Sequence, residues 1–325
     1  MKNILRLLLA VTFCTLTTFV CAQSPVKVIL DTDIDSDVDD VGALAMLHTF
    51  ADNNVAEILG IIVTSEDKYA TMCTDAINHY FGRPDIPIGA LKGVALRDNS
   101  KYTRQISQEF PHDITSYEKA EDGTALYRKL LASQPDTSVV IITIGHLTNL
   151  RNLIESKPDK YSKLSGVDLI KRKVKLWSCM GGAYPEGKEA NFYRPDPAST
   201  KVSVVKWSVP VVFAGWEVGN NIITGGAYLQ KSLPEKSPVW RSYQLYNNFQ
   251  GRPSWDQVSV LYAVSSSNDY WDLKKDGQVV VAEDGSNKWL PGKSNNQAYL
   301  VQKMNPVEVA KVIDALMAGN HINDF

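Results

Sequence analysis

Short apolar runs alternate with longer amphipathic stretches along most of this chain. Runs rich in valine and isoleucine predict buried strands at residues 26–30, 58–64, 86–90, 138–144, 174–180 and 211–215. Helical spacing of apolar positions predicts helices at residues 41–48, 72–80, 125–132, 147–155 and 258–263. Strands that alternate with helices are typical of a mainly parallel sheet with helices on both faces. We therefore predict an α/β fold with an open, Rossmann-like sheet.

The last part of the chain has a different pattern. Asp-Gly pairs at residues 276–277 and 284–285 predict turns of a hairpin, and residues 306–317 predict a closing helix. No linker, repeat or low-complexity tract interrupts the chain, and open α/β sheets reach this size as one unit. We predict a single domain over residues 23–325, in which this last part contributes to stability and not to chemistry.

Residues 1–22 have the pattern of a signal peptide. Lys2 and Arg6 form a basic start, residues 7–20 are apolar, and residues 20–22 form a small-residue cleavage site. A lipoprotein signal at Cys21 is the alternative, which residues 18–20 fit poorly. We expect an exported protein, periplasmic or extracellular, without a membrane span elsewhere.

Composition narrows the classes of function. The chain is 44% hydrophobic and 22% charged, which is ordinary for a globular protein, and its formal net charge of −2 argues against a nucleic-acid surface. Two of its 4 cysteines, Cys14 and Cys21, lie in the predicted signal peptide. Only Cys73 and Cys179 remain, so we expect no disulfide framework.

Residues 31–40, here called the acidic loop, carry six aspartates between a predicted strand and a predicted helix. At ~4 Å two like charges repel by roughly 4 kcal/mol at an effective dielectric of 20, so a cation bound by the loop is favoured over a solvated loop rich in helix caps. Oxygen ligands suit Ca²⁺ better than Zn²⁺. An EF-hand is excluded, because Ser36 and Gly42 stand where it needs Gly and Glu. A haloacid-dehalogenase-type phosphatase fits less well, because Asp35 stands where that family has Thr or Val.

The acidic loop resembles the start of the inosine–uridine nucleoside hydrolase family, which has Asp-Thr-Asp, a short loop and Asp-Asp-Ala-x-Ala-Leu. This chain has Asp-Thr-Asp at residues 31–33 and Asp-Asp-Val-Gly-Ala-Leu at residues 39–44. Its intervening loop is about two residues longer, and Asp35 stands where longer versions usually have Gly.

Four later stretches also match the family, and the resemblance extends to roughly residue 264. They are Gly-His-Leu-Thr-Asn at residues 145–149, Met-Gly-Gly with Glu-Ala-Asn and Asp-Pro-Ala over residues 180–198, Ser-Trp-Asp at residues 254–256, and residues 64–67, where many members have Gly-Asn. Two features depart from the family. Trp255 replaces a His that is thought to assist the departing base, and residues 183–188 lack an Asn for the 5′-hydroxyl, which Lys188 does not clearly replace.

The resemblance implies roles for eight residues. Asp33 is the base that activates water and a metal ligand, and the other Ca²⁺ ligands are Asp40, Asp256 and the Ile144 carbonyl. Asp39, Glu189, Asn191 and Asp67 bind substrate. Trp255, which departs from the family, is expected to bind substrate by stacking on a flat base. Because of the longer loop, Asp35 and Asp37 stay open as alternatives to Asp33. Asp196 is expected to cap the next helix, and His146 to be a loop residue.

We therefore predict hydrolysis of the N-glycosidic bond of ribonucleosides or related ribosides, with a cation holding the water and Asp33 taking its proton. The alternatives are a secreted calcium-dependent nucleoside- or sugar-binding protein without turnover and a Mg²⁺-dependent phosphatase. The sequence decides neither base preference nor oligomeric state, and a homo-oligomer is compatible with it.

Overall fold

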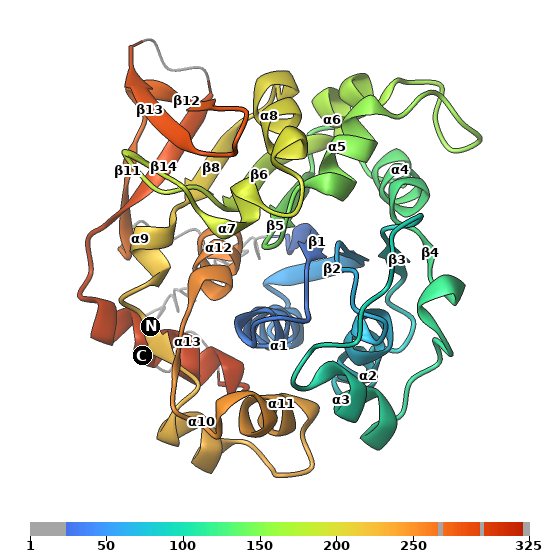
Figure 1. The fold of residues 1–325 in the computed structure, drawn as a ribbon, viewed down its shortest axis with the longest axis vertical. Helices are drawn as coiled ribbons and strands as arrows, with labels where there is room; N and C mark the ends of the chain where they lie inside the picture. The colour runs from blue at the N-terminus through green and yellow to red at the C-terminus, as the bar shows by residue number, and fades with distance from the viewer. Residues whose placement is uncertain (1–23, 266–268, 293–295, 321–325) are drawn as a thin grey trace, which may run out of the picture.

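The computed structural model describes residues 24–265, 269–292 and 296–320 (Figure 1). The predicted signal peptide lies outside the described residues. The centre of the molecule is a nine-stranded sheet with the strand order β11-β14-β8-β6-β5-β1-β2-β3-β4. All pairs in it are parallel except β11 with β14. The α/β fold with a mainly parallel sheet is thus confirmed.

The central strands of the sheet match short, strongly apolar or β-branched segments, whereas the edge strand β4 is Glu-Asp. In chain order the strands of the sheet are β1 (Val26–Thr32), β2 (Ala56–Val63), β3 (Ile88–Ala90), β4 (Glu121–Asp122), β5 (Val139–Thr143), β6 (Val174–Met180), β8 (Val211–Ala214), β11 (Trp271–Lys274) and β14 (Gln297–Gln302). Three of these, β4, β11 and β14, were not predicted as strands of the main sheet.

Helices cover both faces of the sheet (Figure 1). On one face lie α1 (Asp39–Asp52), α2 (Ala70–Tyr80), α3 (Thr103–Glu109), α11 (Pro238–Asn247), α12 (Trp255–Val264) and α13 (Pro306–Met317). On the other lie α4 (Gly123–Ser133), α5 (Thr148–Glu155), α6 (Gly166–Lys173) and α8 (Pro197–Lys206). Alternate residues of β1 point to opposite faces of the sheet. Val28 and Leu30 pack in the core on the first face, and Ile29 packs in the core on the second.

Short elements complete the fold at its edges. They are a 3-10 turn (Tyr117–Lys119), α7 (Ala190–Tyr193), α9 (Trp216–Gly219), α10 (Ala227–Ser232), the pair β9 (Ile223–Thr224) and β10 (Arg252–Pro253), and a sheet of β7 (Glu186–Gly187), β12 (Gly277–Val281) and β13 (Asn287–Pro291). The predicted turn at Asp284-Gly285 joins β12 to β13, and Gly285 has a φ of +79°. The turn predicted at Asp276-Gly277 instead leads from the main sheet into this small one.

The strand order reverses beside β1, and this positions the site. The chain builds β2, β3 and β4 outward on one side of β1 and then places β5 on its other side. In open parallel sheets, ligands bind beyond the carboxyl ends of the strands at such a reversal. The acidic loop leaves β1 there, and residues 144–147 leave β5 beside it.

The helix after the acidic loop is longer than predicted. It begins at Asp39, so Asp39 and Asp40 lie in the first turn of α1 and not in the preceding loop. Residues 39–50 of α1 are all buried, which is typical of a helix surrounded by protein. No helix of the described residues is long and apolar enough to cross a membrane.

Candidate active site

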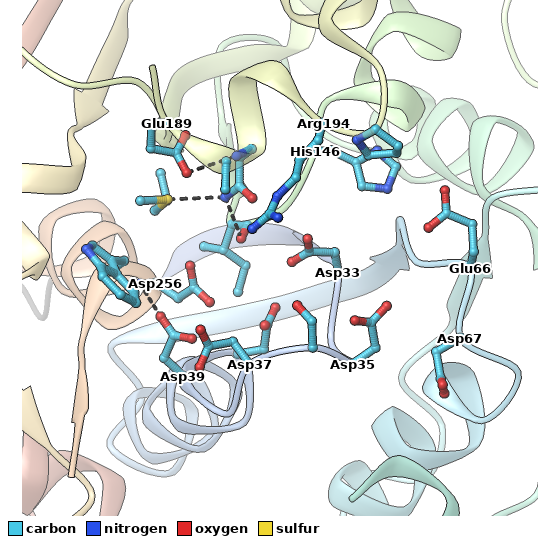
Figure 2. Close-up of a pocket in the computed structure, with 18 of the residues that line it drawn as sticks. Asp33, Asp35, Asp37, Asp39, Glu66, Asp67, His146, Glu189, Arg194 and Asp256 are labelled. Atoms are coloured by element: carbon cyan, nitrogen blue, oxygen red, sulfur yellow. Dashed lines mark hydrogen bonds between the residues drawn. The ribbon is translucent and has the colours of Figure 1, made fainter. Parts of the chain in front are cut away.

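One pocket, with a cavity of about 520 Å³, lies at the carboxyl edge of the sheet (Figure 2). All nine residues that the sequence singled out line it: Asp33, Asp39, Asp40, Asp67, Ile144, Glu189, Asn191, Trp255 and Asp256. They come from seven segments spread over more than 200 positions of the chain. The fold therefore gathers them, although their individual roles stay predictions.

The most buried part of the pocket is the acidic triad of Asp39, Asp40 and Asp256. Carboxylate oxygens of the three lie within 4.8 Å of one another. Asp39 accepts a hydrogen bond of 3.3 Å from the Asp256 backbone N–H, and Asp40 accepts one from the Thr32 hydroxyl. All three lie in the first turns of α1 and α12, where the helix dipoles favour negative charge.

A glycine lets the two helices approach closely enough to form the triad. A Cβ atom on Gly42 would lie 2.5 Å from Gln257 Nε2 and from Tyr243 Oη, and 2.6 Å from Met317 Sδ. Contacts that short do not occur, so any larger residue would displace its neighbours. Gly42 therefore allows Gln257, and with it Asp256, to pack directly on α1.

The triad is electrostatically unfavourable by itself. Burial raises the pKa of Asp39, Asp40 and Asp256 well above its usual value, and the negative charge of nearby aspartates raises each further. A divalent cation would offset this repulsion, and carboxylate oxygens are the ligands that Ca²⁺ and Mg²⁺ prefer. The acidic triad can thus hold a metal ion. It includes Asp39, which was predicted to bind substrate, and does not include the predicted ligand Asp33.

Asp33 lies beside the triad, pressed against the turn that follows β5. A Cβ atom on Gly145 would lie 2.6 Å from Asp33 Cβ, so glycine is needed for this approach. Burial raises the pKa of Asp33 well above its usual value, and the charge of Asp40 adds to the effect. A carboxyl group with a raised pKa is a better proton acceptor at neutral pH than an ordinary aspartate.

The two alternatives to Asp33 have other partners. Asp37 forms a two-pronged ion pair with Arg252, with 2.7 Å between Oδ1 and Nε. Asp35 accepts a hydrogen bond from the Ser65 hydroxyl, and burial raises its pKa to about 6. Both side chains therefore anchor the longer loop. Asp33 lies beside the triad and, within the described residues, its carboxylate has no side-chain hydrogen-bond partner.

Glu189 and Asn191 stand on the opposite wall at the start of α7. Glu189 accepts backbone hydrogen bonds from Asn191 (2.9 Å) and Gly182 (3.0 Å), and burial raises its pKa to about 7. The Asn191 side chain donates to the Ile144 carbonyl at 3.1 Å. This hydrogen bond places the predicted backbone ligand and the predicted ribose-binding amide next to each other.

Aromatic and cationic groups border the triad on its other side. The Trp255 indole N–H donates to the Trp216 carbonyl at 3.0 Å, and the Arg252 guanidinium lies 4.9 Å from the centre of the Trp255 ring. Trp216 is 47% exposed at the rim of the pocket. Trp255 is half-buried: it packs against the core and also lines the pocket.

Asp67 differs from the other predicted residues. Its carboxylate accepts from the Thr103 hydroxyl (2.7 Å) and from the Tyr69 backbone N–H (2.9 Å). Figure 2 shows this side chain turned away from the acidic cluster, whereas the neighbouring Glu66 faces the pocket. Its contacts are those of a residue that fixes the loop after β2.

Four pocket residues that matter for the argument below were not predicted: Glu66, Arg97, His146 and Arg194. His146 lies in a predicted turn and was assigned to it, and its burial lowers its pKa. Arg194 is three residues after Asn191, a spacing that carries no motif.

Lys188, considered for the 5′ position, instead binds Asp284 at 3.0 Å on the surface. Asp196 caps α8 as predicted, by accepting from the Ser199 backbone N–H at 3.1 Å.

A profile of the inosine-uridine preferring nucleoside hydrolase family matches residues 28–315. The chain belongs to this family. The match continues past residue 264, so the expectation that the family region ends there was wrong. The reason is structural: α13 packs against α1, and Met317 contacts the site of Gly42.

Solved structures show the same fold at low sequence identity. A plant nucleoside hydrolase, PpNRh1, is 16% identical with a TM-score of 0.67, over 90% of this chain and 99% of that one. The inosine-uridine preferring nucleoside hydrolase of Bacillus anthracis is 15% identical with a TM-score of 0.68, over 90% and 99%. The type III effector protein XopQ, complexed with adenosine diphosphate ribose, is 12% identical with a TM-score of 0.67, over 91% and 94%. No curated protein sequence matches significantly.

Proposed function

We propose that this protein hydrolyses the N-glycosidic bond of ribonucleosides or related ribosides, giving ribose and a free base. One observation carries the proposal: a single pocket joins the acidic triad, an aspartate of raised pKa, and Glu189 and Asn191 on the facing wall. Such a pocket offers a cation site, a base and hydrogen-bonding groups for sugar hydroxyls. We further propose, from the sequence of residues 1–22, that the protein is exported.

Ca²⁺ is the cation that we propose for this site. The acidic triad and the Ile144 carbonyl supply the hard oxygen ligands that suit it, and their repulsion without a cation supports binding. When bound, such an ion supplies positive charge that lowers the pKa of water and attracts sugar hydroxyls. The aspartate that was expected to bind hydroxyls, Asp39, is close enough to share in holding the ion.

The protein's own residues account for the remaining steps. Asp33 takes a proton from the attacking water, whose oxygen forms a bond to C1′ while the bond from C1′ to the base breaks. The electron pair of that bond leaves with the base. Glu189 and Asn191 orient the sugar, and Trp255 offers a flat face to the leaving group. Because indole gives up no proton near neutral pH, Trp255 cannot act as an acid.

A panel of nucleosides tests the proposal. The purified protein is incubated with inosine, uridine, adenosine and cytidine with Ca²⁺ or with chelator, and free ribose is measured beside free phosphate. The 5′-monophosphates of the same nucleosides are incubated in parallel as the phosphorylated substrates. We expect ribose release from the nucleosides that requires the cation, and no phosphate release from the monophosphates. Phosphate release without ribose release would support the phosphatase alternative and overturn the proposal.

The second candidate is a binding protein without turnover. A relative of the same fold, XopQ, is described in complex with adenosine diphosphate ribose, and the Trp255 indole provides no acid for the leaving group. Calorimetry separates the two functions. Tight, calcium-dependent binding of nucleosides with no ribose released over many hours would favour binding alone.

A further inference from the structure

The pocket continues past Asp33, away from the acidic triad, into a region that we call the far arm. Glu66, Arg97, Asn99 and His146 line it, and Arg194 reaches into the pocket between this region and the triad. Figure 2 shows Asp256 and Asp39 at one end, Asp33 and Asp35 in the middle, and His146 and Glu66 at the other end. When a ribose lies over the triad with its leaving group toward Trp255, its 5′ carbon points toward the far arm.

Arg194 is a basic group on the same wall of the pocket as the proposed sugar-binding residues Glu189 and Asn191. It directly follows α7, which carries Asn191, and Figure 2 shows its side chain reaching into the pocket above Asp33. The guanidinium lies 5.5 Å from the centre of the Tyr193 ring. Within the described ranges, no carboxylate lies within the 4.0 Å of an ion pair with it. The nearby Asp196 is bonded to Ser199 and Thr148.

Arg97 brings a second guanidinium, from the far arm itself. Its backbone N–H donates to the Glu66 carbonyl at 2.7 Å, and its carbonyl accepts from the Lys68 N–H at 2.8 Å. These two bonds fix its loop beside the loop after β2. Among the residues that the structure describes, Arg97 also forms no ion pair. Two guanidinium groups thus line a pocket that is rich in carboxylates, and neither is held in an ion pair within the described residues; the charge of Arg194 acts on Glu189 from a greater distance.

We propose that the far arm binds a phosphate on the 5′ oxygen of the sugar, through Arg194 and Arg97. The proposal rests on the proposed function and names its substrate class: 5′-phosphorylated ribosides. A guanidinium matches a phosphate with two parallel hydrogen bonds, and such charge-assisted bonds are strong. Asp35 and Glu66 line the same arm and repel an anion, so both arginines are needed. The loss of either arginine should therefore abolish the preference for a 5′-phosphorylated sugar over the unphosphorylated one, and not merely reduce it.

Binding and turnover are measured with and without the phosphate. Ribose and ribose 5-phosphate are titrated into the calcium-loaded protein by calorimetry, and base release is compared for inosine and inosine 5′-monophosphate. The variants are Arg194→Gln, Arg194→Lys and Arg97→Gln. Lys188→Gln is the matched control, because it removes a positive charge from the same segment at a surface position outside the pocket.

We expect ribose 5-phosphate to bind at least about tenfold more tightly than ribose, in line with one or two charged hydrogen bonds. Arg194→Gln and Arg97→Gln should remove this difference with ribose binding unchanged, Arg194→Lys should restore part of it, and Lys188→Gln should keep it. Equal affinity for the two sugars, or a preference that survives in Arg194→Gln, would overturn the proposal.

The same data separate this proposal from the proposed function. If inosine is cleaved and its monophosphate is neither bound nor cleaved, the far arm does not take phosphate and the hydrolase assignment stands. If ribose 5-phosphate binds through Arg194 but no base is released from either substrate, the anion site stands and the hydrolase assignment fails.

Discussion

The two ends of the pocket are built in different ways. The acidic triad lies in the first turns of two buried helices, α1 and α12, and every member is at most 4% exposed. The far arm is built from loops after β2, β3 and β5, and the residue that follows α7 borders it. Close packing of buried helices holds their side chains in fixed positions, whereas residues on surface loops can be replaced at little cost to the stability of the fold. We therefore expect chemistry at the triad end and substrate specificity at the far arm.

The largest effect should follow from Asp33→Asn. Loss of a general base typically costs about 10²–10⁴-fold in turnover, and the amide keeps the shape of the side chain. Ribose release should fall by that factor, while stabilisation by Ca²⁺ is retained, because Asp33 lies outside the triad. Steady-state kinetics and thermal melting with and without Ca²⁺ provide the two measurements.

Asp35→Asn and Asp37→Asn decide whether the base is correctly assigned. Asp35 is bonded to Ser65 and Asp37 to Arg252, so we expect both variants to lose far less activity than Asp33→Asn. If either is inactive while Asp33→Asn remains nearly fully active, the longer loop has shifted the catalytic aspartate.

Removal of the metal should have the next largest effect. At a Ca²⁺ concentration of 100 times Kd, binding adds about 2.7 kcal/mol to the free energy of unfolding, which for a chain of this size corresponds to about 5 °C in Tm. Asp256→Asn should lose this shift. The exposed Asp85 gives the control, since Asp85→Asn should retain it. An unchanged Tm with excess Ca²⁺ and with chelator would show that the triad binds no calcium.

The pH dependence of thermal stability should have opposite signs in the chelated and the calcium-bound protein. Burial raises the pKa of Glu189 and of Asp31 to about 7, so between about pH 4 and pH 7 the folded chain holds more protons than the unfolded chain. Stability of the chelated protein should therefore fall as pH rises through this window. Ca²⁺ binds ionised carboxylates, so its affinity should rise over the same range.

Melting curves at pH 5 and pH 8 test this reversal. We expect a lower Tm at pH 8 than at pH 5 with chelator, and a larger gain from Ca²⁺ at pH 8. A chelated protein that is more stable at pH 8 would mean that the buried carboxyl groups are compensated by partners other than a metal ion.

The sequence predicted the triad end well, because its residues follow strong local patterns. Six aspartates between a strand and a helix, and an aspartate at the start of a later helix, are visible without a structure. The membership of Asp39 in the triad was not, because it depends on where α1 begins. Helix α1 begins two residues earlier than predicted, so Asp39 lies in the triad beside Asp40 while Asp33 remains on the loop.

The far arm could not be predicted, for a physical reason. Glu66, Arg97 and Arg194 meet only because three loops converge beyond the sheet, and loop paths follow from tertiary contacts that no local periodicity encodes. Lys188 shows the difficulty. It stands in the segment where a 5′ contact was sought, yet it turns outward to Asp284. Strand β11 was missed because its four residues alternate between apolar and charged, as in a surface hairpin.

A smaller effect should come from the helix contact that forms the triad. Gly42→Ala would place a methyl group 2.5 Å from Gln257 and Tyr243, so α12 must shift from α1. Overpacking of this kind typically costs about 1–3 kcal/mol, and it should weaken Ca²⁺ binding because Asp256 moves with α12. Gly226→Ala is the control, since its nearest neighbour is the Phe249 carbonyl at 3.8 Å. Equal calcium affinity in both variants would show that the triad tolerates movement.

The smallest effect should appear at the leaving group. Trp255 cannot donate a proton, so departure should depend on how stable the free leaving group already is. A riboside of p-nitrophenol should be cleaved far faster than inosine. Stacking on Trp255 is worth roughly 1–3 kcal/mol per base, so among natural nucleosides a large flat purine should bind best.

Trp255→His should narrow the gap between the rates on the two substrates by about tenfold, which is less than a well-placed general acid typically contributes. The gain is limited because Arg252 lies 4.9 Å from the centre of the ring at this position, and its charge would oppose protonation of an imidazole. Rates of p-nitrophenol and hypoxanthine release from both proteins measure the effect. Equal rates on the two substrates in the unaltered protein would mean that another pocket group supplies the proton, and His146 would then be the first residue to replace.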